Sequence, residues 1–205
     1  ATAGPNTCCD YIRHGGCKQA VLAKCRNALS AGVDPYLHLQ TIGVANQTTM
    51  LRGETEEVQR RIRQAIVDWD GSALGAQNFR FFDTICGATQ ERQDALRELL
   101  DVRMNLLLVV GGYNSSNTSH LAEMGEEKLP TYFVRNASRL LSEREILHYN
   151  LHQRNEVIAK DWLPSGPGVV GITAGASGPD TLMQETLISL FELRGIKRDQ
   201  LDPAG

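Results

Sequence analysis

A run of five apolar residues, Leu106 to Val110, is the clearest feature of the hydrophobic pattern. The run does not alternate with polar residues, which is typical of a strand covered on both faces in a parallel sheet. Gly111 and Gly112 end it, and seven polar or amphipathic residues follow before His120. The sequence therefore predicts a buried strand, a polar loop over residues 113–119 and a helix whose first turn begins at His120.

The same order of strand, polar turn and helix recurs along the chain. We predict further strands over residues 39–44, 79–85, 131–134 and 169–173, and helices over residues 18–29, 54–69, 88–100 and from Pro179 onward. Helices of this kind show apolar residues three or four positions apart, and they alternate with short apolar runs. This alternation predicts an α/β fold with small, mostly parallel sheets flanked by helices.

The pattern over residues 135–168 is mixed, and it contains two histidines four positions apart, His148 and His152. Such a pair can bind a metal from one face of a helix. No thiol stands near this pair in the sequence. We therefore interpret the pair as part of a solvated helix face.

Four of the predicted strands, all except the one over residues 131–134, lead to a small or polar turn before a helix. These turns contain Gln47-Thr48-Thr49, Cys86, Ser115-Ser116-Asn117 and Ser177. The carboxyl ends of parallel strands lie along one edge of a sheet, where ligands bind. Hydroxyl groups beside helix N-termini favour a phosphate or diphosphate. The alternative is that Ser116 or Asn117 merely caps its helix, but one cap does not explain a run of such residues.

The pattern leaves the role of Cys86 open between a packing residue, a nucleophile and an iron-sulfur ligand. A cysteine at a helix N-terminus has a stabilised thiolate, which suits the last two roles. The other cysteines are Cys8, Cys9, Cys17 and Cys25. The total is odd and has no disulfide-framework spacing, so we expect free thiols in a reducing compartment.

Composition narrows the function classes. The 205 residues carry a formal net charge of −3, and no block of Lys and Arg interrupts the chain, so we expect no nucleic-acid partner. No apolar run approaches the roughly 20 residues of a membrane span. The first 16 residues have no apolar signal-peptide segment either. We therefore expect a globular protein that does not bind a membrane.

Several long motifs resemble one enzyme family, the 4-hydroxy-3-methylbut-2-enyl diphosphate reductases. They are DTICGATQERQDA over 83–95, VVGGYNSSNTSHL over 109–121 and GITAGAS over 171–177. Two further segments, GVANQTTML over 43–51 and WLP over 162–164, resemble the plant and cyanobacterial branch. The resemblance runs in one order from about Cys9 to the end of the chain.

This resemblance implies a trefoil of three α/β lobes around a central iron-sulfur cluster. Residues 1–78 would form the rear of the second lobe, and residues 79–205 the third lobe with a C-terminal tail. The implied oxidoreductase removes the hydroxyl of its diphosphate substrate, yielding isopentenyl and dimethylallyl diphosphates in the methylerythritol phosphate pathway of isoprenoid biosynthesis. It also implies an electron donor such as ferredoxin, and a plastid stroma or a cyanobacterial cytoplasm.

Site residues follow from the same resemblance. Cys86 matches one of three cysteines that hold a 4Fe-4S cluster, and the residues that match the diphosphate-binding pocket are Thr48, Ser115, Ser116, Asn117 and Ser177. The two further cluster cysteines, the diphosphate-binding histidines and the proton-delivering glutamate have no counterpart in these 205 residues. We therefore assign no catalytic residue and expect the chain alone to be inactive.

Departures from the family pattern concern Cys8, Cys9, Gly87 and Tyr113. The first two sit where the family has a cysteine that is not a ligand, so we do not take them as replacements. Gly87 and Tyr113 replace an Asp and a Trp of the plant branch. The alternative function is a catalytically degenerate relative that serves as a binding or structural subunit.

Overall fold

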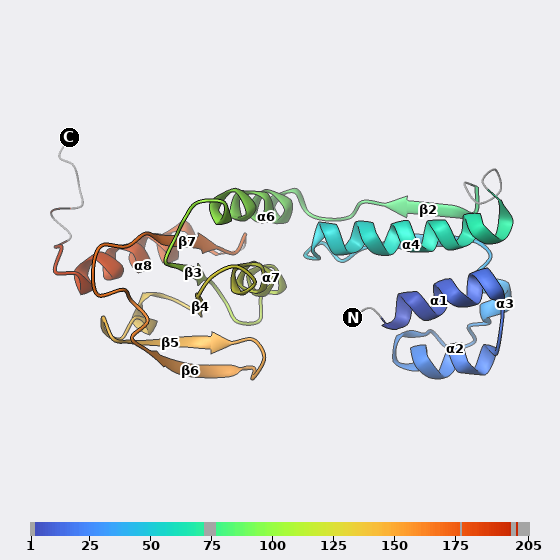
Figure 1. Cartoon of the computed structure of the whole chain (residues 1–205), viewed down its shortest axis with the longest axis horizontal. Helices are drawn as coiled ribbons and strands as arrows, with labels where there is room; N and C mark the ends of the chain where they lie inside the picture. The colour runs from blue at the N-terminus through green and yellow to red at the C-terminus, as the bar shows by residue number, and fades with distance from the viewer. Residues whose placement is uncertain (1–2, 72–76, 177, 198–199, 201–205) are drawn as a thin grey trace. The chain divides into compact units, whose positions relative to one another are not determined.

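The computed structural model describes residues 3–71, 77–176, 178–197 and 200 (Figure 1). The chain forms two compact units, Ala1–Ile85 and Cys86–Gly205. The resemblance implies a lobe boundary between residues 78 and 79, which stays a prediction, and the division of the chain into compact units follows Ile85. The reason is that residues 79–82 pair with a strand of the first unit.

Helices dominate the first unit. Its elements are α1 (Ala3–His14), α2 (Lys18–Cys25), η1 (Arg26–Ala28), α3 (Pro35–His38), β1 (Ile42–Ala45), α4 (Arg52–Asp70) and β2 (Phe79–Phe82). The α4 helix places Ala65 and Ile66 against Cys9 and Ile12 of α1, which together form the core of this unit. The apolar residues of α4 recur at helical spacing, so one stripe of the helix is buried.

The sheet of the first unit consists of β1 and β2, which pair in parallel with Ile42 opposite Phe79. Ile42, Phe79 and Ile62 pack against the α1–α4 core, so this core covers one face of the sheet. Phe81 and Phe82 on β2 remain exposed. The polar end of β1 is tied to the end of β2, because the Thr84 hydroxyl donates to Asn46 O at 2.6 Å.

The second unit alternates helices and strands. Its elements are α6 (Gly87–Leu100), β3 (Leu106–Val110), α7 (Ser116–Glu126), β4 (Thr131–Val134), η2 (Ala137–Arg139), β5 (Glu145–Asn150), β6 (Asn155–Lys160), β7 (Val170–Ala174) and α8 (Asp180–Leu193). The strands β4, β3 and β7 form a parallel sheet in that order, with Leu107 opposite Thr131 and Leu106 opposite Val170. The predicted α/β class with small, mostly parallel sheets is confirmed.

The central strand β3 is buried along its whole length, as its apolar run predicted. Leu106, Leu108 and Val110 face a cluster that includes Leu190 of α8 and Trp162. Leu107 and Val109 face the opposite cluster, which contains residues of α6 and α7. Helices therefore cover both faces of the sheet, which explains why the strand has no polar position.

Residues 145–160 form an antiparallel hairpin of β5 and β6, which the sequence did not predict. His148 lies on β5, where its ring meets the ring of Tyr132 edge-on, and His152 lies in the exposed turn. The interpretation of these histidines as one helix face was therefore wrong. Arg154 in the turn has a φ of 56°, a left-handed conformation that lets the chain reverse.

The polar segment after β3 is shorter than predicted. The α7 helix begins at Ser116, four residues before His120, and Ser115 is its N-cap. The Ser115 side chain accepts a hydrogen bond from Thr118 N, which stabilises the first turn. Ser116 and Asn117 therefore belong to the helix rather than to a loop. None of the helices in the described part of the chain is long and apolar enough to span a membrane.

Candidate functional site

The N-terminus of α7 lies directly after the carboxyl end of β3 and carries three of the predicted site residues. Ser115 caps the helix, and Ser116 and Asn117 form its first turn. The N–H groups of a first turn have no partner within the helix, and the helix dipole there favours negative charge. This end of α7 therefore suits an anionic ligand with several oxygen acceptors.

Asn117 is the least satisfied residue of this turn. Its side chain is only 4% exposed, yet neither its Nδ2 nor its Oδ1 has a hydrogen-bond partner. A buried amide without partners is destabilising by about 1–3 kcal/mol. A ligand that completes its hydrogen bonds would account for such a group at the N-terminus of a helix.

Tyr113 anchors the segment that leads into α7. Its hydroxyl donates to Glu156 Oε1 at 2.8 Å and accepts from Arg135 N at 3.2 Å. Its ring stacks on Tyr149 with centroids 4.6 Å apart, and the Arg135 guanidinium lies 4.8 Å from the ring centroid. Burial and the neighbouring Glu156 raise the pKa of the Tyr113 hydroxyl, so it remains a donor at neutral pH.

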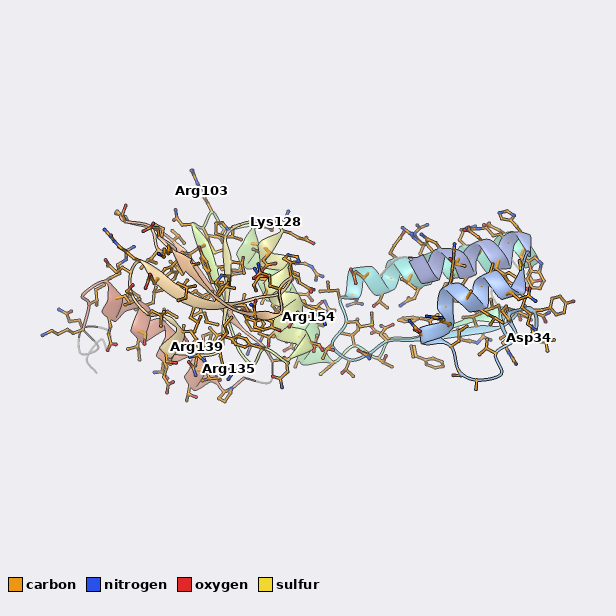
Figure 2. All side chains as sticks on the ribbon, turned by 90° about the horizontal axis from the view of Figure 1, so that it is seen from below. Asp34, Arg103, Lys128, Arg135, Arg139 and Arg154 are labelled. Carbon is orange, nitrogen blue, oxygen red and sulfur yellow. The ribbon has the colours of Figure 1, made fainter. Side chains whose placement is uncertain are left out.

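The same network includes Arg139, whose Nε lies 2.9 Å from Glu156 Oε1. Figure 2 shows Arg135 and Arg139 on the same side of the second unit, in the segment that follows β4. Sequence reasoning noted Tyr113 only as a departure from the family pattern. The network joins residues far apart in sequence, so no local signal in the chain could have revealed it.

Cys86 is the N-cap of α6, with an extended backbone and an exposed thiol that makes no capping hydrogen bond. A short connection, residues 101–105, joins the C-terminus of α6 to the amino end of β3. A helix that follows this route runs antiparallel to the strand, so its N-terminus lies toward the carboxyl edge of the sheet. The topology thus directs Cys86 and the start of α7 toward the same edge.

Thr48 belongs to the first unit, where it is exposed in the turn after β1. A cavity of about 370 Å³ beside this turn is lined by residues that include Asn46 and Met50. The Asn46 Nδ2 atom is buried and has no hydrogen-bond partner. Sequence reasoning did not select Asn46, and its position directly before Gln47 and Thr48 is the signal that was available.

Ser177, the remaining predicted site residue, lies outside the described residues. The structure thus brings together Ser115, Ser116 and Asn117 on one helix turn, and it places Thr48 in the other unit. Burial and the adjacent Cys25 thiol raise the pKa of Cys8 to about 11, and burial raises the pKa of Cys9. Both shifts favour the protonated thiol in the absence of a metal ion.

Comparison with known proteins identifies the family. The family model described as LytB protein matches residues 14–191. The chain is 47% identical to the 4-hydroxy-3-methylbut-2-enyl diphosphate reductase of Gloeobacter violaceus over 92% of its length, and 45% identical to the same-named protein of Thermosynechococcus vestitus over 92%. These matches cover 45% and 47% of the two relatives, so the chain spans less than half of their length.

A solved structure shares the fold. The structure of the E-1-hydroxy-2-methyl-but-2-enyl-4-diphosphate reductase from Plasmodium falciparum aligns with 96% of this chain and 61% of its own, with a TM-score of 0.51 and 16% sequence identity. The resemblance inferred from the motifs is confirmed by these relatives. Because the family model covers most of its residues, the chain belongs to the LytB protein family.

Proposed function

We propose that this chain is part of a reductase that removes the hydroxyl of 4-hydroxy-3-methylbut-2-enyl diphosphate, and that the start of α7 binds the diphosphate. The observation that carries the proposal is Asn117, whose amide is buried without a partner on the first turn of a helix. Diphosphate oxygens would accept hydrogen bonds from this amide, from Ser115 and from the free N–H groups of the turn. The names of the two cyanobacterial relatives described above supply the substrate class.

Titration of the chain with inorganic diphosphate, followed by calorimetry, tests this binding site. We expect Asn117→Ala to weaken binding by about tenfold to a hundredfold, as for a lost hydrogen bond to a charged group. The matched control is Asn105→Ala. Asn105 lies at the amino end of β3, where its Oδ1 accepts from Val169 N at 2.8 Å, so this variant should lose stability but keep diphosphate affinity. Equal affinity of wild type and Asn117→Ala would contradict the proposal.

Cys86 fits one ligand position of an iron-sulfur cluster. Its thiol is exposed, makes no capping bond and lies at a helix N-terminus, where negative charge is favoured. Clusters of this kind need several thiolates. In the described residues no three His, Cys, Asp or Glu side chains form a metal-binding group. We infer that the remaining ligands come from polypeptide other than these 205 residues. The cluster, when bound, would supply the electrons for the reduction.

Anaerobic reconstitution of the complete reductase with iron and sulfide tests this ligand. Cys86→Ser should lose the cluster absorption, whereas Cys17→Ser should retain it. Cys17 is an exposed cysteine whose thiol donates to Gln19 Oε1 at 3.2 Å, so it is a suitable control. A stable cluster in Cys86→Ser would refute the assignment. Because the two relatives come from cyanobacteria, we infer that the electron donor is of the ferredoxin type. For the same reason we infer that the protein acts in a cyanobacterial cytoplasm or a plastid stroma.

A catalytically degenerate binding subunit is the second candidate, and the single thiol among the described strand-end turns favours it. The two functions differ in one measurement. A reductase assembled from this chain and its missing ligands converts the diphosphate substrate and takes up iron, whereas a degenerate relative binds diphosphate without iron uptake.

A further inference from the structure

The helices α1 and α2 form a hairpin in the first unit. Residues 15–17 connect them, and Gly15 and Gly16 have positive φ values of 67° and 133°, which let the chain reverse. The two helices lie side by side (Figure 1). Helices joined by so short a connection run antiparallel. Residues at equal distances from the turn therefore face each other across the hairpin.

Cys8 of α1 and Cys25 of α2 occupy facing positions in this hairpin. Cys8 lies four residues before Ile12, which is buried. Cys25 lies four residues after Val21, which is also buried. Residues four positions apart lie on the same face of a helix, so both thiols are directed to the seam between the helices. The two side chains meet there, where the Cys8 and Cys25 thiols are hydrogen-bonded to each other, and both cysteines are partly exposed.

The other three cysteines have different surroundings. Cys9 is 2% exposed and belongs to the core between α1 and α4. Cys17 is exposed, and its thiol donates at 3.2 Å to the side chain two residues later. Cys86 lies in the second unit. Cys8 and Cys25 are therefore the two thiols that this fold brings together.

The α2 helix has few other contacts that hold it to the first unit. All eight of its residues are described, and Val21 alone among them is buried. The Lys18 ammonium group lies 2.6 Å from Asp34 Oδ2, but both side chains are partly exposed, so this ion pair adds little stability. A covalent bond at the end of α2 that is distant from the turn would prevent the helix from separating from α1.

We propose that Cys8 and Cys25 form a disulfide in the presence of a low-molecular-weight disulfide such as oxidised glutathione, and that this bond locks α2 onto α1. One cysteine displaces a glutathione molecule and forms a mixed disulfide, and the second cysteine then displaces the other glutathione molecule. One S–S bond is broken and one is formed, and the two cysteine protons pass to the two released glutathione thiols. In a reducing compartment the pair stays as the free thiols of this structure.

Incubation of residues 1–205 with oxidised glutathione tests the pairing. Exchange proceeds through the thiolate, and the pKa of Cys8 is raised to about 11, so we expect the reaction to take on the order of hours. The remaining thiols are then alkylated and the chain is digested with trypsin. Cleavage after Arg13 and Lys24 places Cys8 and Cys25 on different peptides. Mass spectrometry should find these peptides linked, and dithiothreitol should release them.

Single variants assign the bond. Cys8→Ser and Cys25→Ser should lose the linked peptides. Cys17→Ser is the matched control, because Cys17 is more exposed than either member of the pair, and it should keep them. Cys9→Ala should also keep them, which separates Cys9 from Cys8 on the same tryptic peptide. Linked peptides that persist in Cys8→Ser, or that vanish in Cys17→Ser, would overturn the assignment.

The same oxidation in urea shows whether the fold brings the thiols together. In an unfolded chain, cysteines closer in sequence, such as Cys17 and Cys25, pair more readily than Cys8 and Cys25. Equal yields of the Cys8–Cys25 link in folded and unfolded chain would overturn the proposal, and so would glutathione adducts on both thiols without a link.

Hydrogen exchange tests whether the bond locks α2. Oxidation should slow exchange in residues 18–25 of the wild type and should leave exchange in Cys25→Ser unchanged. Equal exchange rates in the oxidised and reduced wild type would show that the bond does not hold α2, and this part of the proposal would fail. None of these outcomes bears on the diphosphate site proposed for α7, which belongs to the second unit.

Discussion

The two units differ in how completely they cover their strands. In the second unit all five residues of β3 are buried, and helices pack on both faces of its sheet. In the first unit β1 alternates between partly buried and exposed positions, and the last three residues of β2 are all exposed, with Phe82 at 63%. Parallel strands normally require cover on both faces. The difference indicates that the second unit has a complete core, whereas the core of the first unit covers one face of its sheet only.

Among the tests of this comparison, the largest expected loss of stability is that of Leu108→Ala in the second unit. Leu108 is fully buried at the centre of β3, so its truncation should cost about 3–5 kcal/mol of the free energy of unfolding. Urea unfolding combined with hydrogen exchange should show loss of protection in the second unit and unchanged protection in residues 3–71. If protection falls equally in both units, the two units unfold together, and the inference that they have separate cores is wrong.

A slightly smaller effect is expected from Ile66→Ala in the first unit. Ile66 of α4 is fully buried against α1, and its truncation should lower the free energy of unfolding by about 2–4 kcal/mol. Hydrogen exchange should report the loss in the first unit alone. Phe82→Ser is the control for this unit, and its exposed ring should change stability by no more than about 0.5 kcal/mol. A large loss in Phe82→Ser would show that this face of β2 is covered in solution.

The Tyr113→Phe variant sharpens the comparison within the second unit. It removes the hydrogen bonds to Glu156 and Arg135 N while leaving the stacked ring, so we expect a loss of about 1–2 kcal/mol by thermal or urea unfolding. The Tyr132→Phe control removes a half-buried hydroxyl that has no hydrogen-bond partner among the described residues, so it should be nearly neutral. Equal effects of the two variants would mean that the Tyr113 network adds no stability.

The smallest expected effect concerns acid. Burial lowers the pKa of His148 from its ordinary value of 6.5, so the folded state binds this proton less readily than the unfolded state. The stability due to neutral His148 is therefore present above pH 6.5 and is lost as the pH falls from 6.5 toward the lowered pKa. His148→Phe should flatten this part of the stability profile. The exposed His152→Gln variant should leave it unchanged.

The strands and helices with a clear pattern of hydrophobic residues could be predicted from the sequence. The strands at 106–110 and 131–134 match β3 and β4 at both ends, and the predicted helix over 88–100 begins one residue later than α6. These segments are buried on one or both faces, so their side chains report the packing directly. The hairpin of β5 and β6 was missed because most of its residues are partly exposed, and their polarity therefore follows no period of two.

The candidate site was only partly predictable. The run from Ser115 to Asn117 identified a polar helix terminus, but the sequence placed the helix start at His120, because serine and asparagine are poor guides to where a cap ends and a helix begins. That Asn117 is buried without partners follows from the packing of α7 on β3 and β4. That Thr118 packs against Gly111 and Gly175 follows from the pairing of β3 with β7, whose ends are far apart in the chain.

The order of the strands along the chain also determines when the strands of the second unit can pair during synthesis. The central strand β3 is synthesised before either of the strands that flank it. Val170, which pairs with Leu106, is synthesised 64 residues later. At roughly 5–20 residues per second, this interval is about 3–13 seconds. Throughout it, five apolar residues with an unpaired strand edge are present in the nascent chain. Until β7 is made, the edge of β3 that later pairs with it is open to pairing with other chains.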